Sequence, residues 1–179
     1  MASYGGKDLA NAFRTVRKNT IQIAEDIPES SYGFAAAPEV HSVARMLTHV
    51  AISTSFWDEV HKKQKLATLV GFNFSAIMER AEADEAKSRS KAEIIALLQS
   101  EGEQFAAWME TLTSEFLAET YTEPDGKTVK SRLESLLGAK EHEMHHRGQL
   151  MLIERQLGIV PHLTRQRQER IAQMRAAKA

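Results

Sequence analysis

The stretch that decides the fold is TVKSRLESLLGAKEHEMHHRGQLMLIERQLG, residues 128–158. A Pro-Asp-Gly turn stands just before it at residues 124–126, and Gly158 ends it as a glycine ends many helices. We therefore predict one long helix over residues 128–158. Pro161 follows, and a last, polar helix is expected over residues 164–177.

Three further segments have the spacing of amphipathic helices. The first places one stripe on a helix at alternating steps of four and three: Leu9, Phe13, Val16, Thr20, Ile23 and Ile27. The second begins near Ser42, a good N-cap residue, and its inward stripe is Met46, His49, Ser53, Phe56 and Val60. The third covers about residues 90–116, where Ser90 and Glu93 have the spacing of a capping box.

These four long segments predict an all-α protein, built as a four-helix bundle with an additional short C-terminal helix. A shorter helical segment is expected at residues 74–87, and no segment has the pattern of a β-strand. We interpret residues 1–179 as a single domain, with its core at about residues 7–161 and a basic C-terminal extension at residues 162–179.

The composition narrows the classes of function. With 42% hydrophobic and 26% charged residues and a net charge of -1, the chain has no global field that would attract nucleic acid or an anionic membrane. No stretch approaches the ~20 apolar residues that cross a bilayer. The N-terminus lacks the apolar run of a signal peptide, so we expect a cytoplasmic protein. The absence of cysteine excludes disulfides, cysteine-ligated metals and a cysteine nucleophile.

A histidine pair stands in the middle of the long helix. At about 100° per residue, His142 and His146 lie one turn apart on one face, where two imidazoles can converge on a cation or serve as hydrogen-bonded core residues. His145 points to another side, toward an outer contact or solvent. The best third ligand is His49, although a lone histidine on an apolar stripe is also common in cores. The histidines expected to be exposed are His41, His61 and His162.

Residues 142–146 also satisfy the His-Glu-x-x-His pattern of zinc metalloproteases, in which the glutamate is the general base. Such enzymes need a third ligand downstream, yet residues 147–152 contain no histidine, and Glu154 and Glu169 are the remaining candidates. No obvious edge strand is available to hold an extended peptide. A protease is therefore the less favoured interpretation.

Two other carboxylates have open roles. Glu143 is rotated about 100° from His142 and can pair with Lys140 or Arg147 on the surface rather than act as a base. Glu101 interrupts an apolar seam of the third helix, so it is either a buried partner of a ligand histidine or an exposed residue. The sequence identifies no catalytic residue.

The histidine-bearing segments resemble the DinB-like family of metal-binding four-helix bundles. The matching motifs are His142 through His146-Arg147-Gly148-Gln149 on the long helix, and the setting of His49 within residues 46–51. The resemblance covers about residues 7–161. It implies that His49, His142 and His146 are the ligands of one divalent metal ion.

Three imidazoles leave at least one coordination position open for water or substrate. They suit zinc best, and they also accept nickel or another transition metal. The resemblance implies a metal-dependent enzyme that activates a thiol or water, similar to thiol-dependent S-transferases, with a small-molecule substrate such as a low-molecular-weight thiol. The alternatives are a non-catalytic metal-binding or stress-associated protein and a zinc hydrolase that uses the His-Glu-x-x-His segment.

The long helix has a second apolar stripe, which consists of Leu133, Leu137, Met144 and Met151. We expect it to lie in a homodimer interface, and the alternative is that the C-terminal tail folds back over it with Ile171 and Met174. The tail carries a basic run, which we interpret as a solvated helix rather than a nucleic-acid contact: Arg165, Arg167, Arg170, Arg175 and Lys178.

Overall fold

The computed structural model describes residues 4–178. Its α-helices are α1 (Gly6–Asp26), α2 (Val43–Ile52), α3 (Ser55–Trp57), α4 (Phe74–Glu85), α5 (Lys91–Glu110), α6 (Ser114–Ala118), α7 (Arg132–Gln156) and α8 (His162–Ala176). A short 3₁₀ helix covers Glu29–Ser31, a π-helical stretch covers Asp58–Lys63, and two strands are β1 (Thr120–Thr122) and β2 (Val129–Ser131). No helix described here has both the length and the apolar character that a membrane crossing requires.

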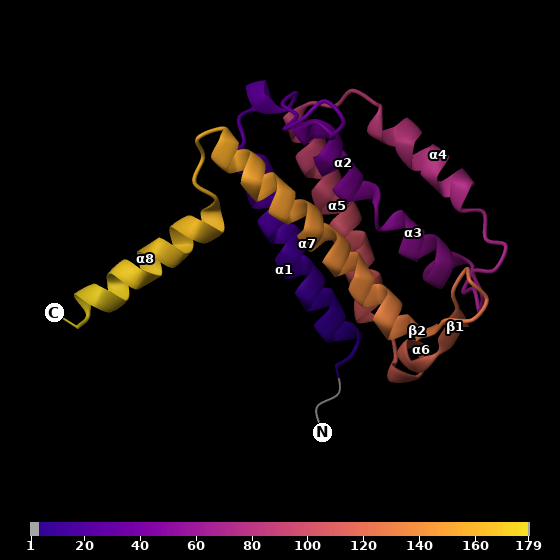
Figure 1. Cartoon of the computed structure of the whole chain (residues 1–179). Helices are drawn as coiled ribbons and strands as arrows, with labels where there is room; N and C mark the ends of the chain where they lie inside the picture. The colour runs from indigo at the N-terminus through magenta and orange to yellow at the C-terminus, as the bar shows by residue number, and fades with distance from the viewer. Residues whose placement is uncertain (1–3, 179) are drawn as a thin grey trace.

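The predicted four-helix bundle is confirmed. Helices α1, α2, α5 and α7 pack side by side, and α4 lies outside them, across α2 and α3 (Figure 1). The hairpin and α6 close one end of the bundle. Helix α8 points away from the bundle, so the tail does not fold back over α7 as one alternative supposed (Figure 1).

Local sequence signals set the helix starts. The Ser42 hydroxyl accepts a hydrogen bond from the amide of Arg45 at the start of α2. At the start of α5, Ser90 and Glu93 form the predicted capping box. The stripe expected on α1 is buried. It packs into two core clusters, in one of which the rings of Phe13 and Phe105 meet edge to face with centroids 5.2 Å apart.

Two helix boundaries and one hairpin differ from the sequence-based prediction. The prediction that the chain has no strands was wrong, because residues 120–122 pair with residues 129–131 in an antiparallel hairpin. Since this hairpin occupies residues up to 131, α7 begins at Arg132 rather than near residue 128. The strands have three residues each, too few for an alternating pattern. The third helix ends at Glu110 rather than near residue 116, because the Thr113 side chain caps the separate helix α6.

The second helix was predicted to run unbroken to Val60, and it does not. Helix α2 ends at Ile52, a turn follows at residues 53–54, and the chain then winds as α3 and a π-helical stretch. In that stretch the amide of Gln64 donates to the carbonyl of Glu59, five residues back, at 3.0 Å. Wider winding of this kind is common at functional sites.

A buried ion pair joins all four helices of the bundle. The Arg17 side chain of α1 and the Glu143 side chain of α7 are 4% and 2% exposed, and Arg17 Nε donates to both carboxylate oxygens at 3.0 Å. Arg17 Nη1 donates to the Leu98 carbonyl of α5 at 2.8 Å, and Nη2 donates to the Val50 carbonyl of α2 at 3.1 Å. Glu143 therefore lies in the core and does not pair with Lys140 or Arg147 on the surface.

Helix α5 makes room for this arginine with a glycine. A Cβ atom added at Gly102 would lie 2.8 Å from Cγ of Arg17. Burial raises the pKa of Glu143, and the positive charge of Arg17 opposes that rise. The carboxylate and the guanidinium thus depend on each other, because either one alone would be a buried, uncompensated charge.

The joint between α7 and α8 contains a second buried carboxylate. Glu154 is fully buried, and both of its oxygens lack a hydrogen-bond partner among the described residues. Burial, together with the negative charge of Asp26, raises the pKa of Glu154 to about 7. Asp26 itself accepts a hydrogen bond from Arg165 at 2.6 Å, which fastens the start of α8 to α1.

The expected interface stripe of α7 is mostly covered within the chain. Leu133 and Leu137 pack against one core cluster and Met151 against the other. Met144 is 43% exposed. The homodimer therefore remains a prediction, with Met144 as the exposed member of the stripe.

Replacing Arg17 by methionine should destabilise the protein by about 3–5 kcal/mol, because Glu143 would stay buried without its partner. The double variant Arg17→Met/Glu143→Leu should recover most of that loss. Urea unfolding of both variants measures the free energies. Arg14→Met is the matched control. Arg14 lies on α1 like Arg17 but pairs at the surface with Glu103 and Glu110 of α5, so its loss should cost less than about 1 kcal/mol. Equal losses for Arg17→Met and Arg14→Met would refute the central role of Arg17.

Glu154→Gln should change how stability depends on pH. The folded-state pKa of Glu154 is raised from 4.5 to about 7, so between these values the folded protein binds more protons than the unfolded chain. The free energy of unfolding of the wild type should therefore fall as pH rises through this window, and the glutamine variant should lack that contribution. Urea unfolding of both proteins at pH 4.5, 6 and 8 in EDTA measures their difference. A difference that is the same at all three pH values would contradict the expectation.

Candidate metal centre

Three histidines from two helices converge at the middle of the bundle. His49 comes from α2, and His142 and His146 lie one turn apart on α7. His142 Nε2 lies 3.1 Å from His49 Nε2 and 3.2 Å from His146 Nε2, and one nitrogen of each ring lies within 4.8 Å of the others. Among residues 4–178, no other three histidine or carboxylate side chains come together in this way. The structure thus brings together all three histidines that the sequence singled out.

Glu85, at the end of α4, orients His49. Its Oε1 lies 2.7 Å from His49 Nδ1, and its Oε2 accepts from Arg45 Nε at 3.1 Å. The carboxylate is 5% exposed, and it is the one buried residue of α4. A carboxylate at Nδ1 holds the proton there and leaves the Nε2 lone pair facing the other two histidines. Glu85 was not predicted from the sequence, because the acid-rich segment 79–85 has no pattern that separates this residue from its neighbours.

Gln149 plays a similar part at His146. Its amide oxygen lies 2.9 Å from His146 Nδ1, and its amide nitrogen lies 3.2 Å from His145 Nε2. His145 is exposed, as expected, and contacts the centre through this glutamine. The Nε2 lone pair of His146 is therefore also directed at the cluster.

The environment keeps His142 and His146 neutral. Burial, with smaller contributions from the neighbouring histidines, lowers the pKa of His142 to about 4. Burial also lowers the pKa of His146. Neutral imidazoles are the form that binds metals, because the lone pair must be free.

The hydrogen bonds and distances fit a cation. With protons at Nδ1 of His49 and His146, both of their Nε2 atoms are acceptors, and one proton on His142 Nε2 can satisfy only one of them. A cation between the three rings would satisfy all three lone pairs. Nitrogen ligands of a tetrahedral zinc ion lie about 3.3 Å from each other, close to the 3.1 and 3.2 Å separations around His142.

Glu143 does not face this cluster. Although it follows His142 in sequence, its carboxylate is held by Arg17 in the core. Both oxygens accept from that guanidinium, so the glutamate of the His-Glu-x-x-His pattern is not placed as a general base for the histidine centre. Glu101 is also away from it: this half-buried residue lines a separate surface cavity with Lys63 and Arg80.

Two histidines that were expected to be exposed are buried. His61 is fully buried, with Nδ1 3.0 Å from Arg132 Nη1 and Nε2 2.8 Å from Ser135 Oγ. Because Arg132 can only donate, Nδ1 accepts and Nε2 donates to the serine, so His61 cannot take the serine proton as a base would. Burial lowers its pKa to about 4. His162 is 3% exposed at the α7–α8 joint, and His41 is half-buried near the centre.

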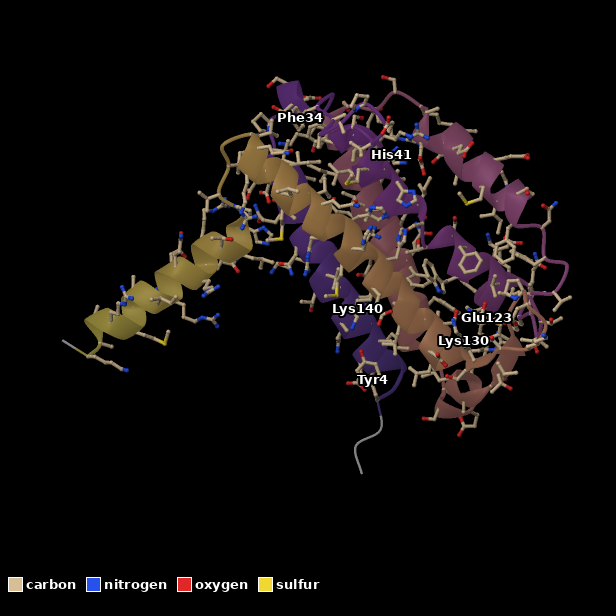
Figure 2. All side chains as sticks on the ribbon, viewed as in Figure 1. Tyr4, Phe34, His41, Glu123, Lys130 and Lys140 are labelled. Carbon is tan, nitrogen blue, oxygen red and sulfur yellow. The ribbon has the colours of Figure 1, made fainter. Side chains whose placement is uncertain are left out.

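Two cavities open beside the cluster. One, of about 310 Å³, lies between α2, α3 and α4 and reaches His49 and His142. The other, of about 400 Å³, reaches His146 and Gln149. His41 lines both, and Figure 2 shows it near Phe34, at the end of the bundle opposite Glu123 and Lys130 of the hairpin.

Comparison with known proteins agrees with this architecture. Residues 12–150 match the sequence profile of the DinB superfamily. No curated protein sequence matches the chain significantly. Among solved structures, one similar chain is YfiT from Bacillus subtilis, described as a probable metal-dependent hydrolase with an unusual four-helix bundle topology. It is 16% identical, with a TM-score of 0.67 over 89% of this chain and 91% of that one.

Two further structures share the fold. A DinB-like protein from Bacillus subtilis, YjoA, is 22% identical, with a TM-score of 0.61 over 84% of this chain and 91% of that one. A mutant of the mycothiol-dependent maleylpyruvate isomerase is 10% identical, with a TM-score of 0.62 over 84% of this chain and 63% of that one. At these identities the likeness is one of fold.

Replacing Glu85 by alanine should weaken zinc binding by about 10- to 100-fold, because His49 would lose the carboxylate that fixes its tautomer. Competition with a chromophoric chelator measures the affinity. Glu82→Ala is the matched control, since Glu82 is an exposed acid one turn earlier on α4. Wild-type affinity in Glu85→Ala, or an equal loss in Glu82→Ala, would show that the contact with His49 does not matter.

Proposed function

This chain belongs to the DinB superfamily, and we propose that it is a divalent-metal-dependent enzyme that activates a thiol or a water molecule at His49, His142 and His146. The observation that carries the proposal is the convergence of the three Nε2 atoms, with two of the rings oriented by Glu85 and Gln149. Outer contacts of this kind support metal ligands in many proteins.

The donor set favours a catalytic centre over a sealed structural one. Structural zinc sites have four protein ligands, whereas catalytic sites have three and leave a position for substrate. Among the described residues, three side chains meet here, and cavities reach the cluster. A metal ion bound there would lower the pKa of a coordinated thiol or water and so supply an anionic nucleophile near neutral pH.

The chain's own residues would orient and enclose the reactants. Glu85 holds the proton on His49 Nδ1, and Gln149 fixes the ring of His146. Trp57 lies beside the centre: its ring centroid is 6.2 Å from that of His142, and its Nε1 donates to the Ser135 carbonyl at 2.8 Å. A fixed indole there gives the cavity next to His142 an apolar wall.

The finer assignments are proposals as well. We propose zinc as the resident metal, with nickel or another transition metal as the alternative, and a low-molecular-weight thiol as the co-substrate of an S-transferase-like reaction. The thiol is suggested by the fold shared with the mycothiol-dependent isomerase, and hydrolysis by the description of YfiT. We also propose a single domain over residues 1–179 that acts in the cytoplasm as a homodimer.

The protein purified without an affinity tag should contain about one equivalent of metal, and His49→Ala should lose it. His145→Ala is the matched control, because this exposed histidine is next to the cluster but outside it. Elemental analysis of the three proteins measures the metal content. Absence of metal from the wild type, even after incubation with zinc or nickel, would refute the proposal.

The reaction type is tested next on metal-loaded wild type. Conversion of an electrophilic substrate that depends on an added thiol would support the transferase. Hydrolysis of an ester or amide without thiol would support a hydrolase. If neither activity is found across a panel of substrates, the protein binds metal but the proposed catalysis is refuted.

A further inference from the structure

The cavity beside His49 and His142 has an apolar wall that the metal centre does not explain. Its main apolar side chains are Phe56, Trp57, Phe74, Ile77 and Met78, and we call it the aromatic pocket. Its volume of about 310 Å³ is that of a small ligand site. It extends from the imidazoles outward under α4.

The walls of the aromatic pocket are held in place by contacts among themselves. The Phe56 and Phe74 rings stack with centroids 6.0 Å apart, and Phe56 meets Trp57 edge to face at 5.3 Å. Trp57 is further fixed by its hydrogen bond to the Ser135 carbonyl. A preformed apolar wall binds a ligand without the entropic cost of ordering side chains.

The charges at the rim leave no strong preference for a charged ligand. Arg45 lies at the rim and pairs with Glu85, and Glu82 lies beside them. His41 is half-buried and carries a pKa lowered by burial, with a further lowering by Arg45. The pocket therefore selects by shape and apolar surface, not by charge.

The second cavity provides room for another reactant. It reaches His146 rather than His49 and His142, and His41 is the one lining residue that the two cavities share. A group-transfer reaction needs two reactants that meet at one point, and two cavities that reach different histidines of the same cluster meet this requirement.

We propose that the aromatic pocket binds the aromatic or branched apolar part of the substrate whose polar head reaches the three histidines. This inference rests on the proposed metal centre and names the class of substrate for it. The other cavity then takes the second reactant. The substrate is a small molecule with an apolar group of about the size of a phenyl ring next to the reacting atoms.

The test compares two zinc-binding probes on the zinc-loaded full chain: benzohydroxamate, which carries a phenyl ring, and acetohydroxamate, which carries a methyl group. Benzohydroxamate should bind at least about tenfold more tightly, because its ring buries apolar surface in the pocket. Ala81→Phe, which fills the pocket from α4, should abolish this preference and leave the affinity for acetohydroxamate unchanged. Ala83→Phe is the matched control on the exposed side of the same helix and should keep the preference.

Methyl NMR of methionine-labelled wild type gives a second reading. Benzohydroxamate should shift the methyl resonance of Met78, in the aromatic pocket, and not that of Met46, in the other cavity. The proposed role of the aromatic pocket is refuted if benzohydroxamate binds no more tightly than acetohydroxamate, or if the Met46 methyl resonance shifts in place of that of Met78. In either case, binding of zinc and acetohydroxamate would still support the metal centre. If zinc itself does not bind, the proposed function and the inference that rests on it both fail.

Discussion

The buried pair of Arg17 and Glu143 is the constraint on which the rest of the structure depends. One guanidinium contacts a carboxylate of α7 and carbonyls of α2 and α5, so it fixes the relative position of all four bundle helices. Glu143 follows His142 directly, and a rotation of α7 that released the carboxylate would also turn the histidines away from α2. At about 100° per residue, a helix that buries Glu143 toward α1 must present His142 on a neighbouring face. The ion pair that holds the core thus also sets the direction of the metal-ligand candidates.

Much of the fold could be predicted because its signals are local. Ser42, Ser90 and Glu93 cap helices through neighbours three residues away, and the i,i+4 spacing of His142 and His146 places them on one face of any helix. The third histidine needed an apolar stripe and a family resemblance, and the structure brings it to the other two. The caps and the histidine pair thus require only the regular geometry of one helix, whereas His49 lies on a second helix and required the resemblance as well.

What could not be predicted depends on contacts between distant segments. Glu85 and His49 are 36 residues apart, and Arg17 and Glu143 are 126 apart. An isolated sequence does not indicate which of many charged residues will meet. His61 was misplaced for another reason: it falls near the end of the predicted second helix, and a histidine at a helix end was expected to be exposed. The π-helical winding of residues 58–63 instead buries it together with Val60.

Helix α4 contributes to the candidate site but little to the bundle core. It forms a wall of the aromatic pocket, yet Glu85 at its end is its one buried residue. Substitutions at the exposed positions of α4, such as Met78 and Glu82, leave the bundle core untouched, so they cost little stability, as exposed substitutions generally do. The preference for one apolar group over another can therefore change by mutation while the histidine cluster stays the same. If the aromatic pocket binds the substrate as proposed, the helix that would discriminate between apolar groups is one whose exposed face can vary at little cost to the fold.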